Sequence, residues 1–558
     1  MEVVKKYRLF FLGALSAVLF GLFIQAQNPD SYFEVSKNLD IYTNIFKELN
    51  AYYVDPIEPG KMVKTGIDAM LNTLDPYTNY ITESDIEEYV FQTTGKYGGI
   101  GANMSKRNDK IIVSDVYENS PVDKAGIKIG DELLSVNGQS VKNKSTEDIY
   151  LLFKGSIGTQ YKVQIKDAFT SQQSDKTIVL SEIQLSSLPY VGLVGKDNNV
   201  AYVHLSQFTP MCSNQVRKAL DSLKKVQPAL TSVVLDLRAN PGGLLNEAVS
   251  ICNLFIDKGI SVVKAKGKIP ETSEDFKTTQ SPWDLQIPVA VLLNQGSASA
   301  SEVVAGTLQD LDRAVIIGQR SYGKGLVQIT KSVGYNAKLK LTIAKYYTPS
   351  GRCIQAIDYS HRNADGSVGH IPDSLKKEFK TKAGRRVLSG GGVDPDFVIE
   401  DEDISKLAIT LLSKYYLFDY ATNYAKEHKT IASATAFSLT DNDFAQFTKW
   451  LEGKDYSYKT DAEIDLDSFR SSAINEKIFD NAKAEYNALL AKIGHDKKQD
   501  LVKHKHEITR MLEAEIASRY YFLRGRIENN LKDDKDLEKA VAVLSQPTLY
   551  KATLTTSK

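Results

Sequence analysis

The sequence predicts a multidomain α+β protein with four folded regions behind an apolar N-terminal segment. The chain has 558 residues, which at about 150 residues per domain suggests three to four domains. Its apolar pattern changes along the chain from helical, to short strands, to alternating strands and helices, and back to helical. With 42% hydrophobic and 25% charged residues, its composition is that of a globular protein.

The charge balance and the scarcity of Cys and His exclude several function classes. Equal numbers of Lys+Arg and Asp+Glu, 69 each, argue against nucleic acid as a partner. Seven His and three Cys, with neither C-x-x-C nor H-E-x-x-H, argue against a zinc-rich protein. We expect Cys212, Cys252 and Cys353 to be small buried side chains rather than a disulfide framework.

Residues 1–26 are predicted to be a secretory signal or an uncleaved anchor. Lys5, Lys6 and Arg8 precede the uncharged apolar run 9–24, and cleavage is expected after Ala26. The run is near the lower length limit for crossing a bilayer, so a membrane tether through residues 9–24 is the alternative. Both interpretations predict an exported protein of the periplasm or cell envelope.

Residues 30–185 are predicted to form two small regions. Residues 30–88 carry apolar side chains at helical spacing and are expected to be an N-terminal helical region. Residues 89–185 contain a Gly-rich loop at 98–101, short strands, and a short helix capped by Ser145 or Thr146. At about 95 residues, this second region has the size of one small domain.

Residues 186–400 are predicted to be an α/β core. The runs 232–237 and 289–293 are almost entirely apolar, as expected of strands covered on both faces. Helical patterns follow them at 244–256 and 299–311. Strands that alternate with helices in this way favour a layered α/β arrangement.

Residues 401–558 are charged and helix-prone and are predicted to be a C-terminal helical domain. Its strongest amphipathic segment is 502–526, with apolar side chains from Ile508 to Leu523 on one side. We expect this face to meet a partner helix, which suggests a homodimer.

The stretch 294–302 lies between a predicted buried strand and a helix and contains three candidate nucleophiles, Ser297, Ser299 and Ser301. A helix N-terminus offers unpaired N–H groups that stabilise developing negative charge. Ser301 would point away from Ser299, but the residues alone do not choose between Ser297 and Ser299. The alternative is an ordinary cap, since Ser299 and Glu302 have capping-box spacing.

A serine without a histidine partner needs another base, and Lys324 is the candidate. It lies between Gly323 and Gly325, just after a predicted core strand. A neutral lysine serves as a base when burial lowers its pKa. Gln328 is four residues further and could orient the amine. The alternative is that Lys324 is an ordinary surface lysine, as most lysines are.

The stretch 240–243, Asn-Pro-Gly-Gly, also joins a predicted strand to a helix. Backbone N–H groups of Gly242 and Gly243, together with that of Ala300, are candidate donors to an oxyanion. The alternative is a plain Pro-Gly turn.

Together these stretches resemble the C-terminal processing, or tail-specific, serine peptidases, which pair a PDZ domain with a Ser–Lys catalytic core. The motifs are N-P-G-G at 240–243, G-S-A-S-A-S-E at 296–302 and Y-G-K-G-x-V-Q at 322–328. The pattern G-G-V-D-P-D at 391–396 is also familiar in this family, and the resemblance covers roughly 39–400. Tyr322, where Phe is usual, and Ala239, where a polar residue is common, are small departures.

The resemblance implies a role for each candidate. Ser299 would be the nucleophile, Lys324 the general base and Gln328 its support. Residues 89–185 would be a PDZ domain whose loop receives a peptide's terminal carboxylate; the loop residues are Gly98, Gly99, Ile100 and Gly101. The core would be a crotonase/Clp-protease-like α/β fold. No metal or organic cofactor is implied.

We therefore expect an exported serine endopeptidase that captures protein C-termini and cleaves through an acyl-enzyme. Two alternatives remain open. The first is an adaptor that binds C-termini without cutting. The second is another acyl-transfer enzyme on a crotonase-like core, which the peptide-binding module disfavours because small acyl substrates need no peptide dock.

Overall fold

The computed structural model describes residues 29–363, 366–400, 403–493 and 497–555. The chain divides into two compact units, residues 1–80 and 81–558, which we describe separately. The predicted signal at 1–26 lies outside the described residues. Among the helices that are described, none combines the length and the apolar character needed to cross a membrane. In the first unit, α2 (Pro29–Tyr52) and α3 (Pro59–Asn72) agree with the predicted helical pattern.

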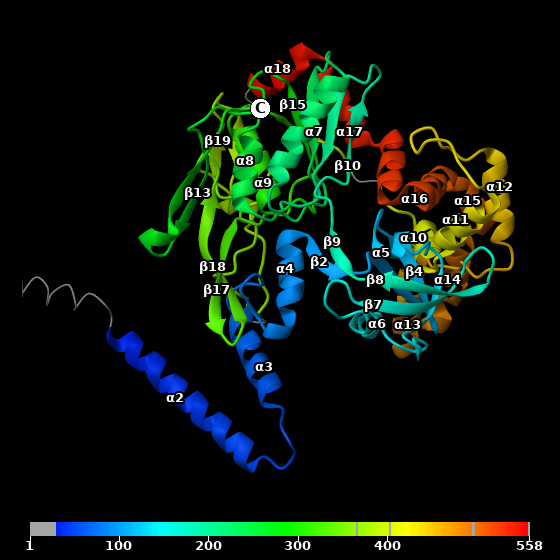
Figure 1. The fold of residues 1–558 in the computed structure, drawn as a ribbon, viewed down its shortest axis with the longest axis horizontal. Coiled ribbons are helices and arrows are strands. Elements are labelled where there is room, and N and C mark those ends of the chain that lie inside the picture. Colours follow the sequence, from blue (N-terminus) through cyan, green and yellow to red (C-terminus); the bar gives the residue numbers. More distant parts are fainter. Residues whose placement is uncertain (1–28, 364–365, 401–402, 494–496, 556–558) are drawn as a thin grey trace, which may run out of the picture. The chain divides into compact units, whose positions relative to one another are not determined.

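The second unit begins with α4 (Ile86–Thr94) and a small β domain that is coloured cyan in Figure 1. Its main sheet has the strand order β3-β4-β5-β7-β8, so β3 is an edge strand, and β2 pairs with β9 separately. Ser145, not Thr146, caps the short helix α6 (Thr146–Leu152). The remaining elements are β2 (Lys96–Gly99), β3 (Ala102–Arg107), β4 (Lys110–Val116), α5 (Pro121–Lys124), β5 (Glu132–Val136), β6 (Gln139–Ser140), β7 (Gln160–Lys166), β8 (Gln173–Val179) and β9 (Ser181–Gln184).

The α/β core is built on a sheet with the strand order β10-β11-β12-β15-β16-β21. The strands from β11 onward run parallel, and β10 pairs antiparallel with β11. Every residue of β12 and β15 is buried, as their apolar runs predict. The strands are β10 (Tyr190–Val194), β11 (Val200–His204), β12 (Ser232–Asp236), β15 (Val289–Leu293), β16 (Val315–Gly318) and β21 (Phe397–Val398).

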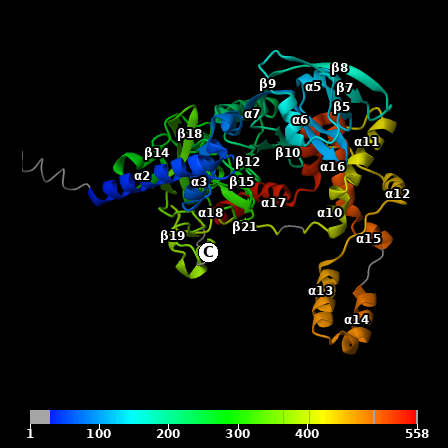
Figure 2. The ribbon, with the colours of Figure 1, turned by 90° about the horizontal axis from the view of Figure 1, so that it is seen from below.

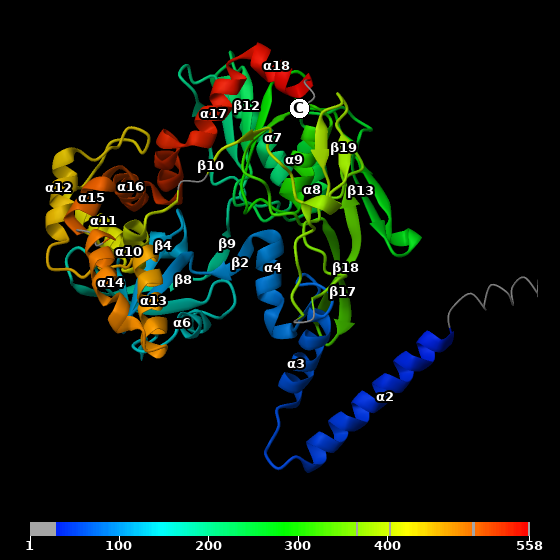
Figure 3. The ribbon, with the colours of Figure 1, turned by 180° about the vertical axis from the view of Figure 1, so that it is seen from behind.

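Helices cover both faces of this sheet. On one face pack α7 (Cys212–Val226), α8 (Leu245–Cys252) and α9 (Ala300–Asp310). On the other face pack α17 (Lys535–Leu544) and α18 (Pro547–Thr555), drawn in red in Figures 1 and 3. The last two helices therefore share the hydrophobic core of the α/β region, although the sequence grouped them with the C-terminal helical domain.

A second sheet of the core carries the residues that follow Lys324. The segment 319–325 between β16 and β17, which contains Lys324, is called the lysine loop. Its strands in the second unit are β13 (Ser261–Gly267), β14 (Glu274–Lys277), β17 (Leu326–Gly334) and β18 (Ala337–Tyr347). The short strand β1 (Asn79–Ile81) lies at the boundary of the two units, and β19 (Glu378–Lys380) and β20 (Arg386–Leu388) form a separate hairpin. Cys212 and Cys252 are buried and unbridged, as expected, and Cys353 is free and partly buried.

The C-terminal helical domain buries the apolar face from which we inferred a partner helix. Ile508, Leu512 and Ile516 of α16 pack into a cluster with α10, α11 and α12 of the same chain. The argument for a homodimer through this face therefore loses its basis. Figure 2 shows the α13–α14 hairpin projecting from this domain. The helices are α10 (Lys406–Ser413), α11 (Tyr416–Glu427), α12 (Asp441–Trp450), α13 (Asp461–Asn475), α14 (Phe479–Ile493), α15 (Lys497–Lys503) and α16 (Lys505–Asn530).

Candidate active site

Two of the three candidate serines lie in the turn between β15 and α9, residues 294–299, which is called the nucleophile turn, and Ser301 lies in α9. The structure distinguishes the three. Ser297 is fully buried, and its hydroxyl donates to the Leu237 carbonyl at 2.8 Å. Ser301 is also fully buried and donates to the Asn240 carbonyl at 2.9 Å. Ser299 is only partly buried and has a strained backbone, with φ 56° and ψ −113°. Strained residues cluster at functional sites, and these contacts favour Ser299 over its two neighbours.

The Ser299 hydroxyl meets a residue that the sequence did not single out. Its Oγ lies 2.9 Å from the hydroxyl of Tyr346, near the end of β18. Burial raises the pKa of Tyr346, so its hydroxyl is neutral near pH 7. A tyrosine in a strand carries no sequence signal of this kind, because only strand pairing brings it to the nucleophile turn.

Glu302 links the nucleophile turn to the lysine loop. Its carboxylate, which is fully buried, accepts from Ser299 N–H and Lys324 N–H, each at 2.8 Å and on the same oxygen. The other oxygen accepts from Gly323 N–H at 2.7 Å and the Ser321 hydroxyl at 2.6 Å. Burial raises the pKa of Glu302, although these hydrogen bonds oppose the rise. Glu302, which the sequence predicted only as part of a helix cap, therefore also joins the two loops through its hydrogen bonds.

Lys324 lies in the connection between β16 and β17 and is partly buried. Tyr322 N–H donates to the Ser297 carbonyl at 3.0 Å, which ties this loop directly to the nucleophile turn. Gly323 has φ 90°, and a Cβ there would come within 2.3 Å of the Ala356 Cβ. Glycine is therefore required beside Lys324 for both conformational and steric reasons.

Two further predicted segments lie near the loop, and one of them contacts it directly. Val393, in the pattern at 391–396, donates its N–H to the Ser321 hydroxyl at 2.7 Å. Gln328 is on β17 next to a β-bulge, and its Nε2 donates to the Thr342 hydroxyl at 3.1 Å. The predicted support of Lys324 by Gln328 stays a prediction.

The 240–243 turn lies directly against Ser299. Gly242 and Gly243 have φ 102° and 141°, and a Cβ on Gly242 would come within 2.7 Å of the Ser299 Cβ. Gly242 N–H donates to the Asn240 side-chain oxygen at 2.9 Å. Gly243 and Ala300 are therefore the better placed donors of the predicted oxyanion set, since Gly242 would first have to leave Asn240.

The predicted carboxylate-binding loop joins two strands of the small β domain. Gly98 and Gly99 belong to β2 and pair with β9, and the buried Ile100 and Gly101 lead into β3. Gly101 has φ 75°, and a Cβ there would come within 2.3 Å of the Ser120 Cβ. The loop's role in binding stays a prediction.

The free edge of β3 faces the helix α6. Met104 N–H on this strand donates to the Tyr150 hydroxyl of α6 at 3.1 Å. An edge strand beside a helix is the arrangement that accepts an added peptide strand.

Three family models match the chain. That of Peptidase family S41 matches residues 199–360, that of the PDZ domain 98–172, and that of the probable PDZ-protease C-terminal helical domain 407–544. They confirm the predicted order of PDZ domain, peptidase core and helical domain.

Curated relatives agree with these matches. A probable CtpA-like serine protease of Staphylococcus aureus (strain COL) is 31% identical over 79% of this chain and 80% of its own length. One of Staphylococcus haemolyticus is 30% identical over 77% and 79%, respectively. The photosystem II D1 C-terminal processing protease is 23% identical, with a TM-score of 0.33, over 64% of this chain and 92% of its own.

The relatives span most of the chain, and the family models match parts of three of its four predicted folded regions. The chain therefore belongs to the CtpA-like serine proteases of peptidase family S41.

Proposed function

We propose that this chain is an exported endopeptidase that recognises protein C-termini through its PDZ domain and cleaves by a Ser–Lys mechanism. One observation carries the proposal: a single buried oxygen of Glu302 accepts from the backbone N–H groups of both Ser299 and Lys324. This shared partner holds the nucleophile and the base on adjacent backbone segments, as proton transfer between their side chains requires.

The first chemical step transfers the Ser299 hydroxyl proton to neutral Lys324 as Oγ attacks the scissile carbonyl. The N–H groups of Gly243 and Ala300 donate to the oxyanion. Lys324 then gives its proton to the leaving amine, and an acyl-enzyme forms on Ser299. In the second half, Lys324 takes a proton from water, which attacks the ester and releases Ser299.

Tyr346 is the competing candidate for the base, because its hydroxyl is the group hydrogen-bonded to Ser299. Burial raises its pKa, so its phenolate is not populated near neutral pH. We therefore assign Tyr346 to orienting the Ser299 hydroxyl before substrate arrives, and Lys324 to proton transfer.

Substrate capture uses the edge of β3 and the loop at 98–101. A peptide C-terminus would add as a strand along β3, with its carboxylate at the loop N–H groups. The Tyr150 hydroxyl accepts from Met104 N–H on this edge, so an incoming peptide carbonyl would replace it. Export, by a cleaved signal or a tether through residues 9–24, completes the proposal and is tested by fractionating cells.

Cleavage of peptides that differ only in their last residues tests the proposal. Ser299→Ala should abolish cleavage because it removes the attacking hydroxyl. Lys324→Arg should abolish it because a guanidinium does not deprotonate. In both variants, circular dichroism and peptide binding should stay unchanged. Tyr346→Phe is the control for the choice of base. It should keep the basic limb of the pH–rate profile, because Lys324 and not Tyr346 is proposed to transfer the proton. Full cleavage by Ser299→Ala would refute the assignment. Binding without any cleavage by the wild type would favour the adaptor.

A further inference from the structure

We propose that Asp534 and Asp536, near the end of the chain, are positioning residues for the peptidase site and act through Arg238. The inference rests on the proposed function. It concerns a cluster that none of the catalytic steps above uses. Arg238 directly precedes the turn that carries the candidate oxyanion donors, and Asp534 and Asp536 lie about three hundred residues later in the chain.

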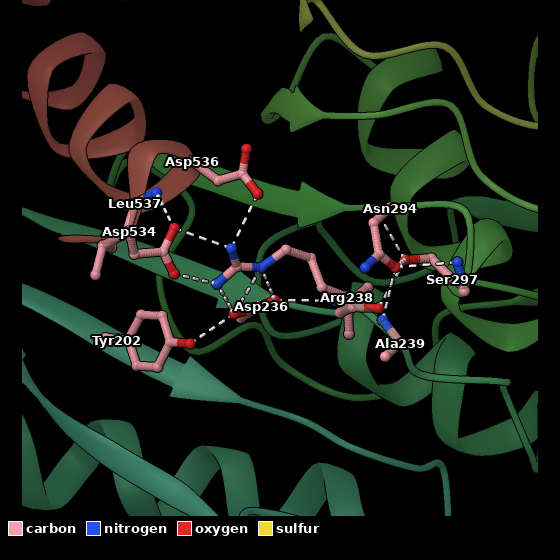
Figure 4. Close-up of polar contacts among 11 residues, drawn as sticks. Tyr202, Asp236, Arg238, Ala239, Asn294, Ser297, Asp534, Asp536 and Leu537 are labelled. Atoms are coloured by element: carbon pink, nitrogen blue, oxygen red, sulfur yellow. Dashed lines mark hydrogen bonds and ion pairs between the residues drawn. The ribbon is translucent and has the colours of Figure 1, made fainter. Parts of the chain in front are cut away.

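The Arg238 guanidinium is saturated by three carboxylates, as Figure 4 shows. Its Nη1 donates to Asp534 and to Asp536, each at 2.9 Å. Its Nη2 donates to Asp534 at 2.6 Å and to Asp236 at 2.5 Å, and its Nε to Asp236 at 3.0 Å. A planar guanidinium held on all its donor edges has one orientation, which a lysine could not reproduce.

The surroundings of the cluster make its charges effective. Asp236 is buried at the end of β12 and also accepts from the Tyr202 hydroxyl at 2.5 Å. Burial alone would raise the pKa of Asp236, but Arg238 holds it below its usual range. Burial raises the pKa of Asp536, and the neighbouring Arg238 guanidinium opposes this rise. Charged hydrogen bonds in such a site are stronger than exposed ones.

Arg238 is joined to the nucleophile turn by a short series of contacts. The next residue, Ala239, has φ 55°, and its N–H donates to the Asn294 side-chain oxygen at 2.7 Å. Asn294 N–H in turn donates to the Ser297 hydroxyl at 3.0 Å, two residues before Ser299. Figure 4 shows Ala239, Asn294 and Ser297 on the far side of Arg238 from Asp534. A shift of Arg238 therefore displaces both turns of the site.

Holding α17 on the sheet does not require these carboxylates. Leu537, Ala540, Val543 and Leu544 bury the apolar face of the helix in the core. Asp534 also caps the helix, accepting from Leu537 N–H at 3.0 Å, but asparagine caps a helix equally well. The charges can thus be removed while the helix stays docked, which separates positioning from folding.

The test is the double variant Asp534→Asn/Asp536→Asn, in the full chain, with a cleavable tailed peptide. We expect kcat to fall by between about 10-fold and 100-fold, because small displacements of a reacting group cost this much. KM should change little. The melting temperature should fall less than in Asp236→Asn, because Asp534 and Asp536 are more exposed than Asp236. Glu538→Gln, which removes an exposed acid one turn along the same helix, is the matched control and should keep wild-type kcat.

A double-mutant cycle with Arg238→Met then tests whether Asp534 and Asp536 act through Arg238. If the carboxylates act through Arg238, adding the Asn pair to Arg238→Met should cost no further kcat. Additive losses, an unchanged kcat in the Asn pair, or a fall in melting temperature that parallels kcat would each overturn the inference. Cleavage by Ser299→Ala distinguishes the two proposals: if this variant still cleaves, the proposed function fails whatever the Asn pair does.

Discussion

Two strand-to-helix turns meet at the site, and they are braced in different ways. The turn after β12 leaves a buried strand through Ala239, with φ 55°, and the turn after β15 does so through Ser299, with φ 56°. Charges hold the first, through Arg238 and its three carboxylates. A buried carboxylate that accepts mainly backbone N–H groups, Glu302, holds the second.

This difference gives the two turns opposite responses to pH. The pKa of Asp236 is held below its usual range, so its contribution to stability is present above the ordinary Asp pKa and is lost on acidification. Burial raises the pKa of Glu302, so its contribution is lost as pH rises through the raised value. We therefore expect the stability of the site to fall both on acidification, through Asp236, and on a rise in pH, through Glu302.

The largest loss of stability is expected from Asp236→Asn. Removing one partner of a buried ion pair costs about 3–5 kcal/mol at neutral pH. The free-energy gap to wild type should shrink as pH falls through the native pKa of Asp236. Urea unfolding at a series of pH values measures this, and a gap that does not change with pH would contradict the charge-braced turn.

Glu302→Gln should cost less, about 1–3 kcal/mol, because a buried acceptor is lost while the side chain keeps its volume. Here the gap to wild type should shrink as pH rises, opposite in sign to Asp236→Asn. Cleavage should fall as well, since Ser299 and Lys324 lose their shared acceptor. If the free-energy gap to wild type changed with pH in the same direction in both variants, the two turns would not differ in how they are braced.

Gly242→Ala should cost about 1–2 kcal/mol of stability for a side chain at positive φ, and the overlap of its Cβ with the Ala298 and Ala300 backbone adds to this cost. Its effect on cleavage should be larger, roughly 100-fold, because the new Cβ would press on the Ser299 Cβ. Gly259→Ala is the matched control: φ is 84° there, but a Cβ would meet nothing within 4 Å. Equal cleavage by both variants would show that contact between the turns is unimportant.

Much of the fold was predictable, because its signals are local. The apolar runs of β12 and β15 predict buried strands, and the pair Ser145–Thr146 predicts a cap for α6, which the structure places at Ser145. The apolar face of α16 was recognised too. The helices of the same chain that cover it were not predicted, because sequence periodicity does not say which segment covers a face. The packing of α17 and α18 on the core sheet was missed for the same reason.

The sequence by itself determined the family, the order of the domains and the glycine and serine positions of the two turns, since these depend on local backbone requirements. Only the tertiary structure decided that Tyr346 meets Ser299, that Glu302 joins Ser299 to Lys324, and that Asp534 and Asp536 reach Arg238. These partners are far apart along the chain or have ordinary local roles, and only the packing of strands and helices on the core sheet brings them together.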